Sequence, residues 1–211
     1  MRPRCNPNSA PSTIARSPLI NRGMLFKQTG PLLTCTYDID HNGTRARWTF
    51  SVSELEGDKI KGVWSRISGG PATSIPVVKT ENGAKFTEEM SLVHGTQMMA
   101  DPAYQWIMFP LGPGNKWEGR SVLSGTSSGG KPWKVDVSYV SKVDGWEKIS
   151  VAGKTSPALK IVSEEKIVGL SSTFSATGKL SIWMGDGPCS VKKGEYRNSF
   201  KETASLVLIS E

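Results

Sequence analysis

A serine lies in the pattern that many hydrolases use for their nucleophile, at Gly125-Thr126-Ser127-Ser128-Gly129. In those enzymes a strand, a sharp turn and a helix expose the serine hydroxyl. Here Gly130-Lys131-Pro132 and an alternating segment follow instead, and neither histidine of the chain is C-terminal to Ser127. A triad of Ser127 with His94 and Asp101, in another chain order, is the enzymatic alternative. We rank it second, because Gly/Ser clusters between strands are ordinarily loops.

Metal-binding residue types do not cluster in this sequence. Histidines 41 and 94 and the three cysteines, Cys5, Cys35 and Cys189, form no CxxC pair and no zinc spacing. We therefore expect no metal and no cofactor. If the protein is exported, we expect one disulfide, with Cys35 to Cys189 as the first choice. Three free thiols are the alternative, and the odd number of cysteines favours neither.

Tryptophan is abundant, with seven residues in the chain: Trp48, Trp64, Trp106, Trp117, Trp133, Trp146 and Trp183. Each indole buries a large area, so packing between sheets is the expected role of most of them. A curved sheet or small barrel can also hold an apolar ligand in an aromatic-lined cavity. Trp106 and Trp117 flank a Gly-Pro loop. We predict that these two are exposed and bind the ligand.

The net charge of +7 is concentrated at the start of the chain. Residues 1–37 hold five of the 26 Lys and Arg and no acid, so the remainder holds 21 basic against 19 acidic groups. The folded part is therefore almost neutral, which argues against a basic duplex-binding stripe. Attachment of the basic tail to anionic lipid or nucleic acid, weakened by salt, is a separate hypothesis. The tail cations are Arg2, Arg4, Arg16, Arg22 and Lys27.

The elements that must position these residues are predicted to be strands, because apolar and polar residues alternate along most of the chain. The clearest unit is 133–162, where Asp144-Gly145 predicts a hairpin turn between two strands and a third strand follows a break at 152–157. Asn42-Gly43 predicts another hairpin turn. The segment 86–99 fits either a strand pair or one helix.

The chain divides into a tail and one domain. Residues 1–30 are rich in Pro, Asn, Ser and Arg, and their prolines are too closely spaced for a helix, so we predict a disordered basic tail. Residues 31–211 are predicted to form a single all-β domain, a curved antiparallel meander that closes as a barrel or a two-layer sandwich. No run of 18 apolar residues is present, and no signal peptide is visible at the start.

A series of short motifs lies along the chain: Phe109-Pro110-Leu111, Gly114, Trp117, Gly145-Trp146-Glu147, Ile149, Val151-Ala152-Gly153, Ala158-Leu159-Lys160-Ile161 and Trp183 before a Gly-Pro turn. Together these motifs resemble a group of uncharacterised, β-rich bacterial envelope proteins. The resemblance covers roughly residues 33 to 209, and the sequence departs from that group at Thr155-Ser156-Pro157, where a Phe usually follows the Ala-Gly pair. The resemblance implies curved antiparallel sheets, an envelope location and no catalytic residues.

These observations together favour a non-enzymatic protein of the periplasm or cell envelope, with a cytoplasmic location as the alternative. We expect it to bind a small apolar ligand or an envelope protein partner through a concave β-sheet. The competing hypothesis is the serine hydrolase with Ser127, His94 and Asp101.

Overall fold

The computed structural model describes residues 34–56, 59–69, 73–80, 83–86, 90–92, 96–126, 130–170, 173–187 and 189–211. These residues form fourteen β-strands, and no helix occurs within them. The strands are β1 (Thr34–His41), β2 (Thr44–Glu56), β3 (Lys59–Arg66), β4 (Thr73–Thr80), β5 (Gly83–Phe86), β6 (Met90–Leu92), β7 (Thr96–Asp101), β8 (Gln105–Met108), β9 (Lys116–Thr126), β10 (Pro132–Val151), β11 (Lys154–Gly169), β12 (Ser175–Met184), β13 (Val191–Asn198) and β14 (Thr203–Ser210).

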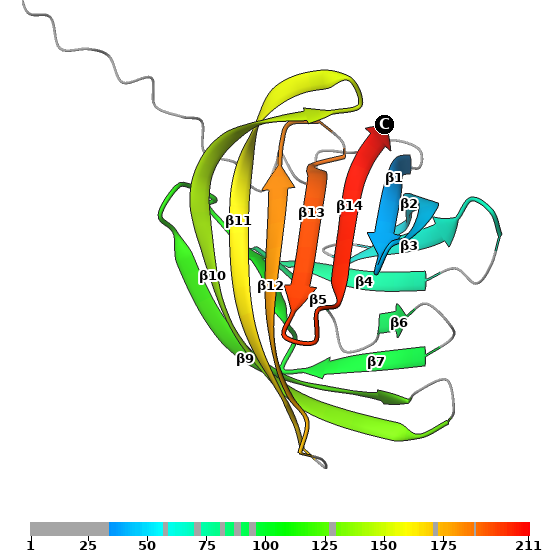
Figure 1. Ribbon diagram of the computed structural model, residues 1–211, viewed down its shortest axis with the longest axis vertical. Coiled ribbons are helices and arrows are strands. Elements are labelled where there is room, and N and C mark those ends of the chain that lie inside the picture. The colour runs from blue at the N-terminus through cyan, green and yellow to red at the C-terminus, as the bar shows by residue number, and fades with distance from the viewer. Residues whose placement is uncertain are drawn as a thin grey trace, which may run out of the picture.

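All fourteen strands belong to one sheet, in the order β6-β7-β9-β10-β11-β12-β13-β14-β1-β2-β3-β4-β5-β8. Every pair of hydrogen-bonded neighbours is antiparallel, and most neighbours are consecutive in the chain. β14 pairs with β1, which brings the last strand beside the first (Figure 1). The all-β antiparallel class predicted from alternation is confirmed.

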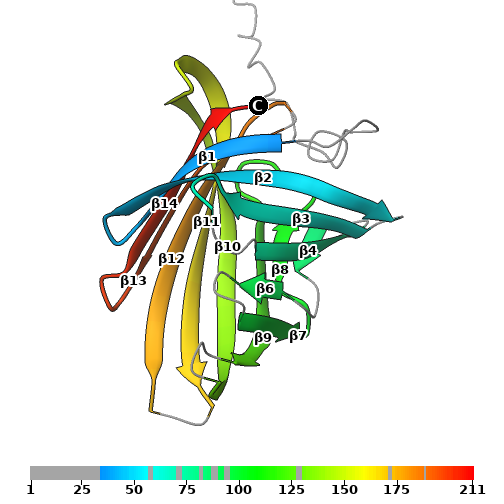
Figure 2. The same cartoon turned by 90° about the vertical axis from the view of Figure 1, so that its right-hand side faces the viewer.

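The sheet is strongly curved. The long strands β10, β11 and β12 run along the upright axis of Figure 1, whereas β3, β4 and β7 run across it behind them. Figure 2 shows the same crossing from the side. β4 lies beside β6, so the two ends of the sheet approach each other. This curvature gives the sheet an inner face, which encloses the core, and an outer face.

The predicted turn at Asp144-Gly145 is wrong, because β10 continues through it as one strand of 20 residues. The register with β11 shifts between Val143 and Gly145, which marks a bulge. The backbone of Val143 is held there by the loop before β9: its N–H donates to Asn115 O (2.9 Å) and its O accepts from Gly114 N (2.8 Å). The chain turns instead at Ala152 and Gly153, whose φ values are 52° and 73°.

The predicted turn at Asn42-Gly43 and one of the two alternatives for 86–99 agree with the structure. Asn42 and Gly43 form the hairpin turn between β1 and β2, with φ values of 51° and 83° that suit a two-residue turn. Of the alternatives for 86–99, the strand pair is the one observed: β6 pairs with β7. No helix long and apolar enough to cross a membrane is found in the described part of the chain.

The interior consists of two clusters on the inner face. The larger contains Leu111, Trp117, Tyr139 and Val143 among its members, and the smaller surrounds Tyr37 and Leu208. A disulfide joins Cys35 on β1 to Cys189 before β13, inside the smaller cluster, with a sequence separation of 154. The first-choice disulfide prediction is therefore confirmed. The predicted tail, residues 1–30, lies outside the described residues.

Candidate functional site

The predicted hydrolase triad is only partly within the described residues. Ser127 and His94 lie outside them, and Asp101 is an exposed residue at the end of β7. β7 pairs with β9, and Asp101 lies opposite Val122. The triad therefore stays a prediction.

The predicted exposure of Trp117 is wrong. Its side chain is 5% exposed and belongs to the larger core cluster, and its Nε1 donates to Gln105 O (3.3 Å). Trp106 is half-buried and packs against the same cluster. Trp117 points inward because it pairs with the buried Ser141 of β10, which places both residues on the inner face. A ligand-binding role for the two tryptophans remains a prediction.

Tyrosines fill the inner face above the core. A Cβ on Gly119 would overlap the hydroxyl of Tyr139, which lies directly across the strand pair, so only glycine fits beneath that ring. The Tyr139 oxygen accepts a hydrogen bond from Gln105 N (2.9 Å), and its ring lies 4.2 Å from that of Tyr104. Burial raises the pKa of the Tyr139 phenol. This region is packed by aromatic rings.

One carboxylate, Glu165, lies among these rings. It accepts a hydrogen bond from the hydroxyl of Tyr104 (2.7 Å). Burial, and then the charge of Glu165, raise the pKa of Tyr104, so this phenol remains a protonated donor. Burial also raises the pKa of Tyr196, whose ring leans over Gly178. The Tyr104 and Tyr139 oxygens thus find hydrogen-bond partners within the cluster, as buried polar groups usually do.

The outer face of the same strands is hollowed into a groove of about 1520 Å³. Seven strands, β9 to β14 and β1, contribute to it. On β10, the exposed groove residues Ser138 and Val140 flank the buried Tyr139. The charged residues of the lining whose side chains lie on the outer face are Asp40, Glu118, Arg120, Glu164, Lys166, Lys179, Glu195 and Arg197; Glu165 also lines the groove, but its carboxylate is the one that Tyr104 binds on the inner face.

Charges of both signs share this groove. Lys179 lies 3.5 Å from Glu164, and Arg120 is paired with Asp136. The Arg120 guanidinium lowers the pKa of the Asp136 carboxyl through a hydrogen bond. Glu118, Lys166 and Arg197 also line the groove and form no ion pair with another described residue. The groove therefore offers both donors and acceptors to a partner.

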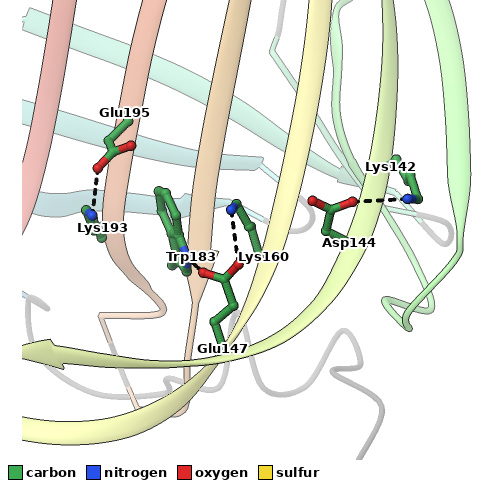
Figure 3. Close-up of polar contacts among 7 residues, drawn as sticks. All are labelled: Lys142, Asp144, Glu147, Lys160, Trp183, Lys193 and Glu195. Carbon is green, nitrogen blue, oxygen red and sulfur yellow. Dashed lines mark hydrogen bonds and ion pairs between the residues drawn. The ribbon is translucent and has the colours of Figure 1, made fainter.

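A tryptophan lies on the outer face between two lysines (Figure 3). Trp183 follows the groove residue Ser181 by two positions on β12, and it pairs with Lys160 of β11 and Lys193 of β13. The two ammonium groups lie 5.0 and 4.6 Å from the ring centroid. Trp183 is 5% exposed, because these lysine side chains cover it.

Two carboxylates complete this row. Glu147 accepts hydrogen bonds from Trp183 Nε1 (2.7 Å) and from Lys160 Nζ (3.0 Å), and Glu195 lies 2.6 Å from Lys193. The bonds from Trp183 and then from Lys160 lower the pKa of Glu147. We call Glu147, Lys160, Trp183, Lys193 and Glu195 the Trp183 row. A neighbouring pair, Lys142 with Asp144 (3.1 Å), lies beside it in Figure 3.

Sequence reasoning missed the groove and the Trp183 row. Their residues read as the solvated half of ordinary alternating strands, which is the usual meaning of such a pattern. One signal was present: Trp183 stands at a polar-face position of β12, between Ile182 and Met184 of the strand's buried end. A large aromatic residue at an outward-facing position of a strand indicates that other side chains cover the outer face there.

Two of the solved structures that share this fold come from bacteria of the genera Bacteroides and Parabacteroides. A Bacteroides fragilis protein, described as exported and with a YmcC-like fold, superposes with a TM-score of 0.58 at 14% identity, over 88% of this chain and 97% of that one. A protein of Parabacteroides distasonis described as a lipoprotein superposes with a TM-score of 0.57 at 11% identity, over 89% and 97%.

No protein-family model matches the chain, and neither does any curated protein. At 11 to 14% identity, the likeness to the solved structures establishes the fold alone. The chain therefore has a YmcC-like, all-β antiparallel fold. In this coarse form the resemblance inferred from short motifs is supported, since the neighbours are described as exported proteins or lipoproteins of bacteria.

Proposed function

We propose that the protein is exported to the bacterial cell envelope and acts there, without catalysis, by binding a protein partner in the outer-face groove. The disulfide between Cys35 and Cys189 supports the location, because disulfides persist in oxidising compartments and are rare in the cytosol. The two structural neighbours, described as exported or as a lipoprotein, support it as well.

The observation that carries the binding role is the groove itself, a hollow of about 1520 Å³ lined from seven strands. The groove is open, most of the described residues that line it are polar or charged, and Val140 is the one branched aliphatic residue among them. Small apolar ligands are usually held in enclosed, mostly apolar pockets, and protein interfaces combine polar groups with a few apolar ones. Between the two partners expected from the sequence, the groove favours the protein.

Site-specific photo-crosslinking in intact cells tests this proposal. A photoreactive amino acid replaces Val140, which is 51% exposed in the groove, and in a matched control it replaces Ile67, which is 56% exposed outside it. We expect a discrete crosslinked species of higher mass from position 140 and none from position 67. No product at either position, or the same product at both, would contradict a partner in the groove.

A further inference from the structure

Two exposed aromatic side chains stack at one end of the sheet. Phe174 precedes β12, and Phe200 lies in the turn between β13 and β14. Their ring centroids are 5.4 Å apart with an interplanar angle of 22°, and they are 42% and 55% exposed. A water-exposed stacked pair is costly, because both rings keep apolar surface in solvent. Surface of this kind commonly marks a binding site.

A third exposed apolar side chain and several cations belong to the same end. Leu170, 51% exposed, follows β11, and its N–H donates to Lys134 O (3.1 Å) on β10. Lys201 follows Phe200 in the turn, and Arg197 on β13 is paired with Thr203 just after that turn. We call Leu170, Phe174 and Phe200, with the cations Lys134, Arg197 and Lys201, the aromatic tip. None of its three apolar side chains lines the groove.

The apolar and the charged residues of the aromatic tip adjoin one another. The apolar side chains belong to the connections between strands, whereas Lys134 and Arg197 lie on the adjoining strands. The adjoining ends of β11 and β12 are at the bottom of Figure 1 and Figure 2, and the turn from β13 to β14 lies higher in both. At a bilayer surface, apolar side chains enter the boundary with the acyl chains and cations meet the lipid phosphates, so a patch that combines the two residue types suits both layers.

The charge balance at the tip is positive. Lys134, Arg197 and Lys201 form no ion pair with another described residue. The acids next to them in the chain have other partners: Glu202 accepts a hydrogen bond from the Asn198 side chain (2.5 Å), and Asp136 is paired with Arg120. Interfaces with proteins usually place apolar anchors at the centre of a polar rim. Here exposed apolar side chains adjoin cations that have no ion-pair partner among the described residues, which favours an anionic membrane surface over a protein partner.

We propose that the aromatic tip docks the protein onto a bilayer containing anionic phospholipid. Phe174, Phe200 and Leu170 enter the boundary between headgroups and acyl chains, and the three cations pair with lipid phosphates. The described chain ends, on β14 and the adjoining start of β1, lie at the opposite end of the molecule, at the top of Figure 1. Docking through the tip is therefore distinct from any attachment through residues 1–33.

Vesicle co-sedimentation of the full chain tests the apolar part of this proposal. The vesicles contain phosphatidylcholine alone or phosphatidylcholine with about one third phosphatidylglycerol. Phe174→Ser combined with Phe200→Ser should weaken binding to the anionic vesicles at least about tenfold, because both rings lose their contact with lipid. Ile67→Ser, which removes an equally exposed apolar side chain elsewhere, should leave binding unchanged.

Charge variants test the electrostatic part. Lys201→Glu and Lys134→Glu, neither of which lines the groove, should each weaken binding to anionic vesicles by about fivefold or more, since each cation near such a surface contributes favourably. Raising the NaCl concentration from about 0.1 M to about 0.5 M should weaken wild-type binding as well. Circular dichroism of each variant confirms that the sheet has formed, so that a loss of binding is not a loss of fold.

Three outcomes would overturn the proposal. The wild-type chain would fail to sediment with anionic vesicles, or it would bind neutral vesicles equally well, or the double phenylalanine variant would bind as the wild type does. The last result, together with loss of the crosslink at position 140 in that variant, would place a protein partner at the tip instead. The crosslink from Val140 in the wild-type chain reports only on the groove, so the two proposals fail separately.

Discussion

The inner and outer faces of strands β9 to β14 are formed by alternate residues of the same strands, yet the two faces bury their tryptophans in different ways. Trp117 and Trp183 are both 5% exposed. Trp117 is enclosed on the inner face by core side chains, and its indole N–H bonds to a backbone carbonyl. Trp183 lies on the outer face, where two lysine side chains cover it and a half-exposed carboxylate accepts its N–H.

This difference shows that the exposed fraction of a tryptophan does not by itself distinguish a core residue from a surface residue. The cover over Trp117 is fixed by the surrounding core, because close-packed side chains have little room to move. The cover over Trp183 consists of lysine side chains, which are flexible and hydrated. The inner face therefore supplies most of the stability, and the outer face supplies a surface whose composition can change at little cost to folding.

Removal of the disulfide should lower the stability of the inner face most, because Cys35 and Cys189 close the smaller inner cluster covalently. Cys35→Ser combined with Cys189→Ser should lower the free energy of unfolding by about 4 kcal/mol, as expected for a cross-link that spans a long loop. Urea unfolding followed by tryptophan fluorescence measures the change. Cys5→Ser, which leaves the cross-link intact, should unfold like the wild type, and equal stability of all three proteins would contradict the expectation.

Neighbouring substitutions on β9 compare the two faces directly. Gly119→Ala places a methyl group into the Tyr139 hydroxyl and should cost about 2 kcal/mol through overpacking. Glu118→Ala, one residue away in the groove, should change stability by less than about 0.5 kcal/mol. Thermal unfolding of both variants tests this contrast.

A double-mutant cycle identifies the cause of the Gly119 effect. In the Gly119→Ala background, Tyr139→Leu should cost less than it does in the wild type, because the clash and the ring are removed together. Additive costs would mean that the alanine acts on the backbone rather than on Tyr139. The same test applies to Gly178, where a Cβ would lie 2.8 Å from the Tyr196 hydroxyl.

The same substitution at Trp117 and at Trp183 should lower the free energy of unfolding by unequal amounts. Trp117→Phe should cost about 2 kcal/mol, because it leaves a cavity and removes the donor to Gln105 O. Trp183→Phe should cost about 1 kcal/mol or less, because the phenyl ring still meets both lysines and water can reach Glu147. Equal losses in urea unfolding would show that the cover over Trp183 is as rigid as the core.

The features that sequence could predict are those that depend on local alternation and turn chemistry. The Asn42-Gly43 hairpin needs positive φ at two adjacent residues, which both types tolerate. Asp144-Gly145 satisfies the same rule, yet it forms a bulge, because the loop at Gly114 and Asn115 holds the backbone of Val143 in place. A dipeptide that suits a turn and a bulge equally is decided by a neighbour about 30 residues earlier in the chain.

The candidate site depended on information that local patterns do not contain. The inward direction of Trp117 follows from its register against Ser141, which is set by the pairing of whole strands. The groove requires the curvature of seven strands, and the curvature is a property of the complete sheet. Without it, Glu118, Lys166 and Arg197 look like any solvated strand face.

The smallest expected effect concerns the carboxylate that joins the Trp183 row. Hydrogen bonds from Trp183 and Lys160 hold the pKa of Glu147 below its ordinary value of 4.5. A lowered pKa in the folded state means that the interaction stabilises the fold at pH values above the unfolded pKa, and that this contribution is lost as the pH falls through the folded pKa. Because Glu147 is 45% exposed, solvent screening should keep the contribution below about 0.5 kcal/mol.

Nuclear magnetic resonance can follow the protonation of Glu147 directly, whereas its effect on stability is too small for unfolding experiments. The indole N–H resonance of Trp183 should titrate with Glu147, at a midpoint below 4.5. Trp183→Phe and Lys160→Gln should each raise the carboxyl pKa, with the larger rise for the tryptophan variant, whose hydrogen bond is the stronger cause of the shift. An indole resonance that stays constant from pH 6 to pH 3 would mean that Glu147 does not hold Trp183 in solution, and the outer face would then present that ring to a partner without first breaking a bond.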